Sequence, residues 1–166
     1  MECRARYMNG TLRLLTNGPI GLDEGEMVFV SIDRARSAVN HKHQFAWIKD
    51  AWLNLPETAQ GQPWADTPET LRKHALIATG YHQSLTLDCG ANATAQRVKA
   101  ALLAAEVKAH GYALGQVRGP VVRIWTPESQ SMRAMGGDRF KESKAAILDW
   151  IAAQIGVSPE ELGRAA

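Results

Sequence analysis

Basic and imidazole side chains cluster in the segment Asn40-His41-Lys42-His43, whose residue types permit metal or phosphate chemistry. A metal ion needs ligands that converge, but two histidines separated by one residue point to different sides of a helix. The nearest carboxylates, Asp33 and Asp50, are several residues away along the chain. The pattern therefore favours phosphate contact or solvated helix surface over a metal site, with His41 on the apolar face and His43 in solvent.

Two groups of basic residues fall around expected helix starts, one at residues 34–42 and one at residues 133–144. Their members are Arg34, Arg36, Lys42, Arg133, Arg139, Lys141 and Lys144. Helix N-termini favour phosphate because their free backbone N–H groups point at the anion. Arginine adds bidentate contacts to phosphate oxygens. A solvated surface explains any one of these residues equally well, so the pairing of two groups is what indicates phosphate binding.

The catalytic case is thin, because the sequence contains no GxSxG elbow, P-loop, GxGxxG fingerprint or HExxH helix. Cys3 and Cys89 lack CxxC spacing, which predicts two reduced thiols rather than a zinc site. We therefore expect a protein that is not an enzyme and needs no cofactor.

Five tryptophans are many for 166 residues. Trp47 and Trp52 fit a core position on a helix. Trp64 and Trp125 lie in or beside predicted loops, where an indole can stack on a nucleic-acid base or fill a core or interface position. Both readings remain open for these two residues.

Composition indicates a cytoplasmic protein with no membrane span. The apolar fraction is 45%, no window of 18 apolar residues occurs, and the N-terminus lacks the apolar stretch of a secretory signal. The net charge of +2 permits nucleic-acid binding without arguing for it. Folding or dimerisation would have to gather scattered basic residues onto one surface.

The longest patterned segment, Arg34–Leu55, predicts an amphipathic helix against which the core forms. The residues of its apolar face are Ala38, His41, Phe45, Ile48, Trp52 and Leu55. Before it, Asn9-Gly10 predicts a hairpin turn or a bulge. A short β-branched run at residues 27–32 predicts a strand, and the simplest arrangement pairs that strand with the first segment.

Further elements follow in sequence order. We expect a helix capped by Thr67 and ending near Thr79, followed by a strand at 81–87. A helix capped by Asn92 or Thr94 should run through His110, and residues 117–125 should form an edge strand or a broken one. A helix capped by Asp138 and a short helix after Ser158 complete the predicted order. Antiparallel strands mixed with helices, without βαβ alternation, predict an α+β fold. The expected fold is a small antiparallel sheet packed with three or four helices, in one domain over residues 1–166 or with a smaller C-terminal helical lobe at 126–166.

Three segments occur in a recognisable order. A strand ending in SIDRARS precedes a polar turn and an aromatic-rich helix, NHKHQFAWIKDAW. A middle helix, ETLRKHALIATGY, follows, and a segment of the Ser-x-Ser type followed by methionine, here ESQSMRAM, precedes a helix that contains phenylalanine. Over residues 27–80 and 125–161 this order resembles the NinB/Orf-like recombination proteins of phages and prophages. The chain departs from that family at Val39, where Gln is frequent, at Gly136-Gly137, and at the helix over 92–110, which has no counterpart.

The resemblance implies a non-catalytic recombination mediator. Such a protein would be a homodimer that binds single-stranded DNA and helps load a recombinase onto DNA coated by the host single-strand-binding protein. The DNA-binding residues carried over by position are Arg34, Arg36, Asn40, Lys42, Ser129, Ser131, Arg133 and Arg139. The basic side chains would neutralise phosphates, which makes binding salt-dependent. The serines and Asn40 would either donate to phosphate or fix the local loop.

Two alternatives stand beside this hypothesis. One is a metal-dependent phage nuclease that would use His41 or His43 with Asp33, Asp50 or Asp138. It predicts DNA cleavage that requires a divalent ion. The other is a small factor that acts on a host or phage protein without touching DNA, which the near-neutral net charge favours.

Overall fold

The computed structural model describes residues 5–14, 21, 23–27, 38–59, 61–131 and 133–158, with side chains in these ranges except at 5, 14 and 38–42. The chain divides into two units, Met1–Ile32 and Asp33–Ala166. Within the described residues there are four α-helices and two small antiparallel sheets. The predicted α+β class, with a small antiparallel sheet packed against helices, is therefore confirmed.

The first unit contains a β-hairpin formed by β1 (Ala5–Met8) and β2 (Thr11–Leu14). Asn9 and Gly10 both have positive φ, at 49° and 82°, as the tight turn predicted for this dipeptide requires. The strand predicted at 27–32 falls almost entirely outside the described residues, and so does its proposed pairing with the first segment.

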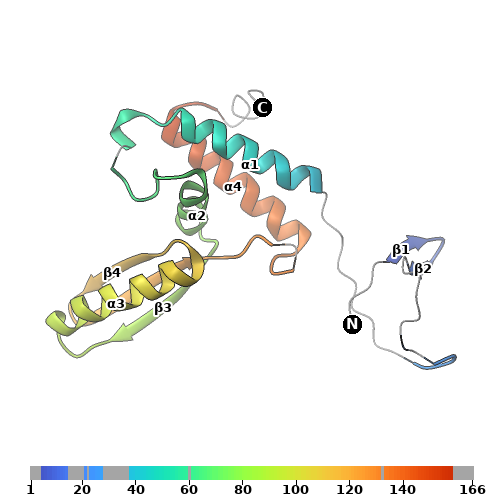
Figure 1. Cartoon of the computed structure of the whole chain (residues 1–166), viewed down its shortest axis with the longest axis horizontal. Coiled ribbons are helices and arrows are strands. Elements are labelled where there is room, and N and C mark those ends of the chain that lie inside the picture. The colour runs from blue at the N-terminus through green and yellow to red at the C-terminus, as the bar shows by residue number, and fades with distance from the viewer. Residues whose placement is uncertain are drawn as a thin grey trace. The chain divides into compact units, whose positions relative to one another are not determined.

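Three helices of the second unit pack together: α1 (Ala38–Leu53), α2 (Pro68–Ala78) and α4 (Gly137–Ile155). Their shared core contains Ile48, Leu76, Ile147 and Ile151, all at most 1% exposed. We call these helices the helical layer (Figure 1). None of the described helices is long and apolar enough to cross a membrane.

The predicted apolar face of α1 is partly wrong. Ile48 is buried as expected, but Phe45 is 41% exposed, and the polar side chain of Gln44 is fully buried beside it. Trp52 packs against the core and donates its indole N–H to Ala65 O at 2.7 Å. Periodicity predicted the helix correctly, but it assigned burial to Phe45, whereas the neighbouring Gln44 is the buried residue.

Of the three helix N-caps predicted for α2, α3 (Asn92–His110) and α4, one is confirmed. Thr67 caps α2 through a bond from the Thr70 N–H to its Oγ1, with a reciprocal bond that completes a capping box. The N-cap of α3 is Ala91, and that of α4 is Gly136, neither with a side-chain cap bond. The caps predicted at Asn92 or Thr94 and at Asp138 are therefore wrong. Asp138 lies instead in the first turn of α4, where its charge still suits the helix dipole.

The second sheet has the order β3-β5-β4, with β3 (His82–Asp88), β4 (Leu114–Arg118) and β5 (Val121–Pro127) all antiparallel. The strand predicted over 117–125 is broken at Gly119-Pro120 into a hairpin. The predicted broken strand is thus confirmed, whereas the alternative of an edge strand is wrong for the second arm, β5, which is the central strand. Pro120 lies in the turn and removes no donor from the ladder, which is why the proline did not force an edge position.

Helix α3 lies across one face of this sheet, and together they form what we call the sheet layer (Figure 1). The core between them is small, with Ala95, Ala113, Val122 and Ile124 as its buried residues. The opposite face carries the alternate residues of β5 and is called the outer face below. Its arginines are exposed.

Candidate nucleic-acid interface

The two helix starts predicted to carry basic groups lie at the same end of the helical layer. Gln44 near the start of α1 and Ser143 near the start of α4 bond to one common side chain, that of Gln130. Trp47, one turn further along α1, lies beside Lys144, the residue that follows Ser143 on α4, and the Lys144 ammonium is 4.3 Å from the centroid of the Trp47 ring. The helices thus run side by side in the same direction, as Figure 1 shows. Their first turns point toward one side of the molecule.

The structure locates only part of the predicted site. Asn40 and Lys42 lie in the first turns of α1, where the backbone alone is described. Arg34 and Arg36 lie outside the described residues. His43 is exposed as predicted, with its ring 6.2 Å from that of Trp47.

The two predicted arginines near α4 have different surroundings. Arg133 is exposed, and no described acidic residue forms an ion pair with it. Arg139 forms a bidentate ion pair with Glu128, with Nε at 2.9 Å from the carboxylate, and its guanidinium lies 5.0 Å from the Tyr81 ring centroid. The hydrogen bonds and charge of Glu128 raise the pKa of Arg139 above its usual value. A phosphate would have to displace that carboxylate, so Arg133 is the better placed of the two.

Ser129 and Ser131 shape the loop between β5 and α4. Ser129 Oγ accepts from the Ser131 N–H at 3.3 Å, and Ser131 Oγ accepts from the Ala134 N–H at 3.2 Å. Both side chains thereby stabilise turns. Of the two roles predicted for these serines, fixing the local loop is the one with visible contacts.

The residue between the serines, Gln130, is a buried hub that sequence reasoning missed. It is 4% exposed, and its Oε1 accepts from Arg72 at 2.6 Å and from Gln44 at 3.1 Å. Its Nε2 donates to Ser143 Oγ at 2.8 Å. Gln130 therefore joins α1, α2 and α4 to the loop after β5. The sequence signal was the spacing of Gln44, four residues before Ile48 and seven before Ala51 on one helix face, since a polar residue on a core face needs a buried partner.

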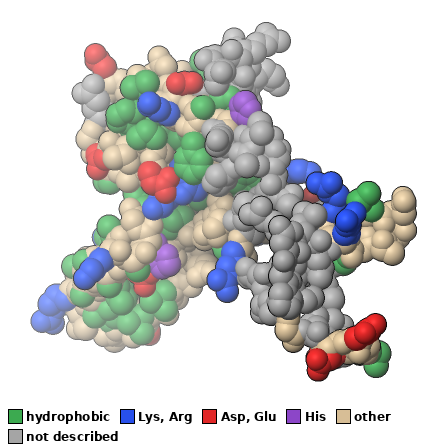
Figure 2. Space-filling model, turned by 45° about the vertical axis from the view of Figure 1, so that its right-hand side comes forward, with side chains coloured by type: hydrophobic (Ala, Val, Ile, Leu, Met, Phe, Trp, Pro, Cys, Tyr) green, Lys and Arg blue, Asp and Glu red, His purple; other side chains and the backbone are tan. Residues whose placement is uncertain are grey.

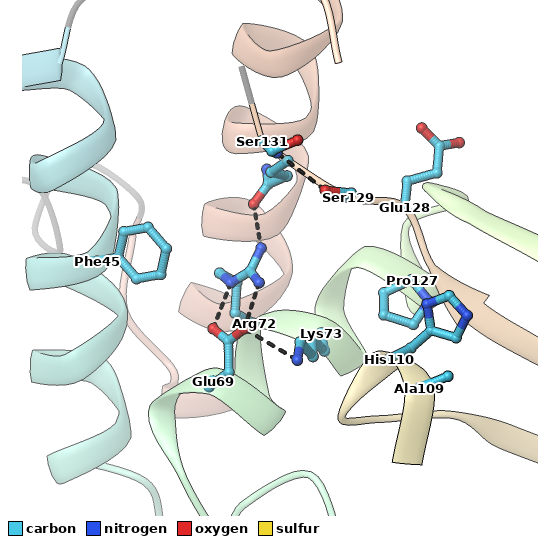
Figure 3. A pocket seen from close by; sticks show the side chains of 11 residues that line it. Phe45, Glu69, Arg72, Lys73, Ala109, His110, Pro127, Glu128, Ser129 and Ser131 are labelled. Carbon is cyan, nitrogen blue, oxygen red and sulfur yellow. Dashed lines mark hydrogen bonds and ion pairs between the residues drawn. The ribbon is translucent and has the colours of Figure 1, made fainter. Parts of the chain in front are cut away.

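A groove of about 410 Å³ opens beside this hub, between Phe45 of α1, α2, the end of α3 and the loop after β5. Figure 3 shows the Arg72 guanidinium between Glu69 and the loop, with Lys73 also reaching Glu69. Burial raises the pKa of Glu69, but the hydrogen bonds and charges of Arg72 and Lys73 outweigh it and lower the pKa overall. Carboxylates thus engage the cations of this groove, which makes it a poor phosphate site.

Lys144 is engaged by an aromatic ring at the shared end of α1 and α4. Its ammonium lies over Trp47 in cation–π geometry, and partial burial lowers its pKa below the usual lysine value. Lys141, one turn earlier, is 73% exposed and only 3.8 Å from Asp138. A pair so exposed contributes little energy, so Lys141 is available to a phosphate.

The outer face of the sheet presents a second cationic surface that the sequence predictions did not include. Arg118 and Arg123 are exposed there, and the Arg123 guanidinium lies 5.9 Å from the Trp125 ring centroid. Arg123 also donates to Thr86 Oγ1 at 3.3 Å on the neighbouring strand. The residues lie on one face because they alternate along β4 and β5 in the observed register. Trp125 is thus a strand residue, whereas Trp64 packs in the helical layer against Trp150.

Charges on the described surface are interspersed. On the part of the second unit drawn in Figure 2, Lys and Arg side chains stand singly among acidic ones rather than in one band. Within the described residues, no group of three or more His, Cys, Asp or Glu side chains could hold a metal ion. Any phosphate contact would therefore involve a few separate cations.

Comparison with protein-family models, curated proteins and solved structures found no match for this chain. The resemblance to NinB/Orf-like proteins stays a prediction.

Proposed function

We propose that this chain binds single-stranded DNA without cutting it, at the surface where the first turns of α1 and α4 meet. The observation that supports the proposal is the parallel course of the two helices, which brings the start of α1, where Lys42 lies, and the start of α4 to one end of the helical layer. Helix N-termini favour phosphate through their free N–H groups and dipole. The homodimer, the recombinase-loading role and the contact with single-strand-binding protein belong to this proposal as predictions from the resemblance.

The charges at this end suit weak, sequence-independent binding. Arg133 and Lys141 are exposed, and Lys42 lies in the first turns of α1. Each cation that neutralises a phosphate releases counterions, so affinity should fall steeply as salt rises. Asp138, 3.8 Å from Lys141, limits the gain at that position.

Fluorescence anisotropy with a labelled oligothymidine over a salt series tests the location. We expect the triple substitution Lys42→Ala, Arg133→Ala and Lys141→Ala to weaken binding at least about tenfold at low salt. The slope of log K against log salt should become shallower by about 2, because each phosphate lost on a single strand contributes about 0.7. The matched control Arg97→Ala, Arg118→Ala and Arg123→Ala removes the same charge from α3 and the outer face of the sheet, and should retain the parental slope.

Three outcomes would contradict this proposal. If the control variant loses as much affinity as the triple variant, the assigned surface is wrong. If the parent chain shows no oligonucleotide binding at low salt, the protein-interaction alternative is selected. If the parent cleaves the oligonucleotide in Mg²⁺ and stops on addition of chelator, the nuclease alternative replaces the non-catalytic function.

A further inference from the structure

Two leucines of the edge strand β3 are exposed on the face of the sheet against which α3 packs. Leu85 is 47% exposed and Leu87 is 44% exposed. In the β3–β5 register they lie opposite Ile124 and Val122, which are both 1% exposed and buried under α3. The helix packs over β4 and β5. It leaves the apolar side chains of β3 open to solvent.

The backbone of β3 also has an open edge. Tyr81 O accepts from the Glu128 N–H at 3.0 Å, and the Cys89 N–H donates to Pro120 O at 2.9 Å. These two bonds lie just beyond the two ends of the β3–β5 pairing. Because hydrogen-bonded and non-bonded pairs alternate in an antiparallel ladder, the odd-numbered residues of β3 bond to β5. The even-numbered residues His82, Ser84, Thr86 and Asp88 direct their backbone groups outward. No described strand pairs with them.

We propose that this edge pairs with β3 of a second copy of the chain, antiparallel and about a two-fold axis at Leu85. In this register His82 lies opposite the partner's Asp88, and Ser84 lies opposite the partner's Thr86. Leu85 meets the partner's Leu85. A two-fold interface of this kind must be self-complementary, since the same surface serves both copies.

The register follows from the outward-facing groups. Only pairings of even-numbered residues with even-numbered residues satisfy both edges, so the axis must pass through a residue, and the central positions of the strand are Ser84, Leu85 and Thr86. An axis at Ser84 leaves Asp88 without a partner residue on the strand, and an axis at Thr86 does the same to His82. The axis at Leu85 pairs the whole strand and places an imidazole opposite a carboxylate at each end.

Side-chain packing favours the same axis. Leu85 would form a pair without hydrogen bonds, the class in which the Cα atoms come closest and side chains touch most. Half-exposed leucines would thereby leave water, and the unpaired edge, a template for aggregation when left open, would be closed. The homodimer itself rests on the proposed function; the β3 interface and its register are what the structure adds, and they do not depend on DNA binding.

Sedimentation velocity of the full chain without DNA, over a concentration series, tests the proposal. The parent should sediment as a dimer at the high end of the series. Leu85→Glu should weaken self-association at least about tenfold, because it places two carboxylates face to face. The control Leu53→Glu makes the same change at a 63% exposed position on α1 and should leave the dimer intact. Unfolding curves of both variants should match the parent.

A charge exchange tests the register. Asp88→Lys places an ammonium opposite the partner's His82 and should weaken the dimer, whereas His82→Asp with Asp88→Lys should restore it. A parent that remains monomeric, a dimer that Leu85→Glu leaves intact, or a double variant that fails to recover would each overturn the proposal. A monomeric parent would also remove the homodimer from the proposed function, whereas loss of oligonucleotide binding leaves the β3 interface untouched, so DNA binding and the interface fail separately.

Discussion

The helical layer and the sheet layer of the second unit differ in how completely they bury their apolar side chains. In the helical layer five of the eight buried core residues are isoleucine or leucine, and Leu71, Leu76, Ile147 and Ile151 are fully buried. In the sheet layer two of the four buried residues are alanines, and α3 leaves the leucines of β3 half exposed. The helical layer is therefore closed by its own side chains. The sheet layer keeps an exposed edge and an exposed face, which a partner could cover.

The largest expected effect comes from making one substitution in each layer. Ile147→Ala in the helical layer and Ile124→Ala in the sheet layer remove the same atoms from sites at most 1% exposed. We expect losses in the free energy of unfolding of about 4 and about 2 kcal/mol, because the cost of a cavity depends on how well its walls can collapse. Ile124 borders a second groove, and Gly115 lies against its Cδ1, so its site can relax. Urea unfolding measures both values, and equal losses would mean that the layers are packed equally well.

The next effect concerns the polar hub of the helical layer. Gln130→Ala leaves Arg72, Gln44 and Ser143 without their common partner, and should cost about 2–3 kcal/mol of unfolding free energy. Gln44→Met is the control. Gln44 Oε1 is buried with no hydrogen-bond partner among the described residues, and Gln130 Oε1 keeps its bond from Arg72. Gln44→Met should change the free energy of unfolding by no more than about 1 kcal/mol. Similar losses in the two variants would show that Gln44 contributes as much as the hub.

The smallest effect is a pH dependence where the two layers meet. His74 packs between Trp64 and Trp150, and its Nδ1 lies 2.8 Å from the hydroxyl of Tyr112 at the end of α3. Burial lowers the pKa of His74 below 6.5. Burial and the charge of Asp66 raise the pKa of Tyr112 to about 12, so its hydroxyl remains protonated at neutral pH.

Protonation of His74 therefore favours the unfolded chain, which binds that proton more strongly. The contribution to stability is complete above pH 6.5 and is lost as the pH falls below that value. Thermal unfolding between about pH 7.5 and about pH 5.5 should show a falling midpoint in the parent and a flatter profile in His74→Phe. His43→Gln, at an exposed position, should keep the parental profile. If the unfolding midpoint of His74→Phe falls with pH as steeply as that of the parent, another group is responsible for the pH dependence.

Local signals in the sequence determined much of the second unit. The start of α2 follows from Thr67 as a cap, and the end of α3 follows from Gly111, a left-handed helix end with φ 72°. The hairpin turn at Asn9-Gly10 is equally local. These features depend on neighbours in the chain, so short-range chemistry suffices to predict them.

The candidate site was predictable only in part. Sequence placed basic residues at two helix starts, but it could not show that Glu128 pairs with Arg139 or that the predicted serines hold a turn. Nor did it place Arg118, Arg123 and Trp125 on one face, because that requires the register of two strands. Ion pairs and strand registers join residues distant in sequence, and periodicity carries no information about such partners.

By itself, then, the sequence determined the class, the start of α2, the end of α3 and the chemical character of the two basic groups, since these depend on composition, caps and spacing. Only the tertiary structure decided that α1 and α4 run in the same direction, that Gln130 joins three helices, and that β3 is an edge with exposed leucines. The physical reason is the same in each case. Burial and pairing are set by the elements that meet in space, and many different arrangements of the same helices and strands satisfy one hydrophobic pattern.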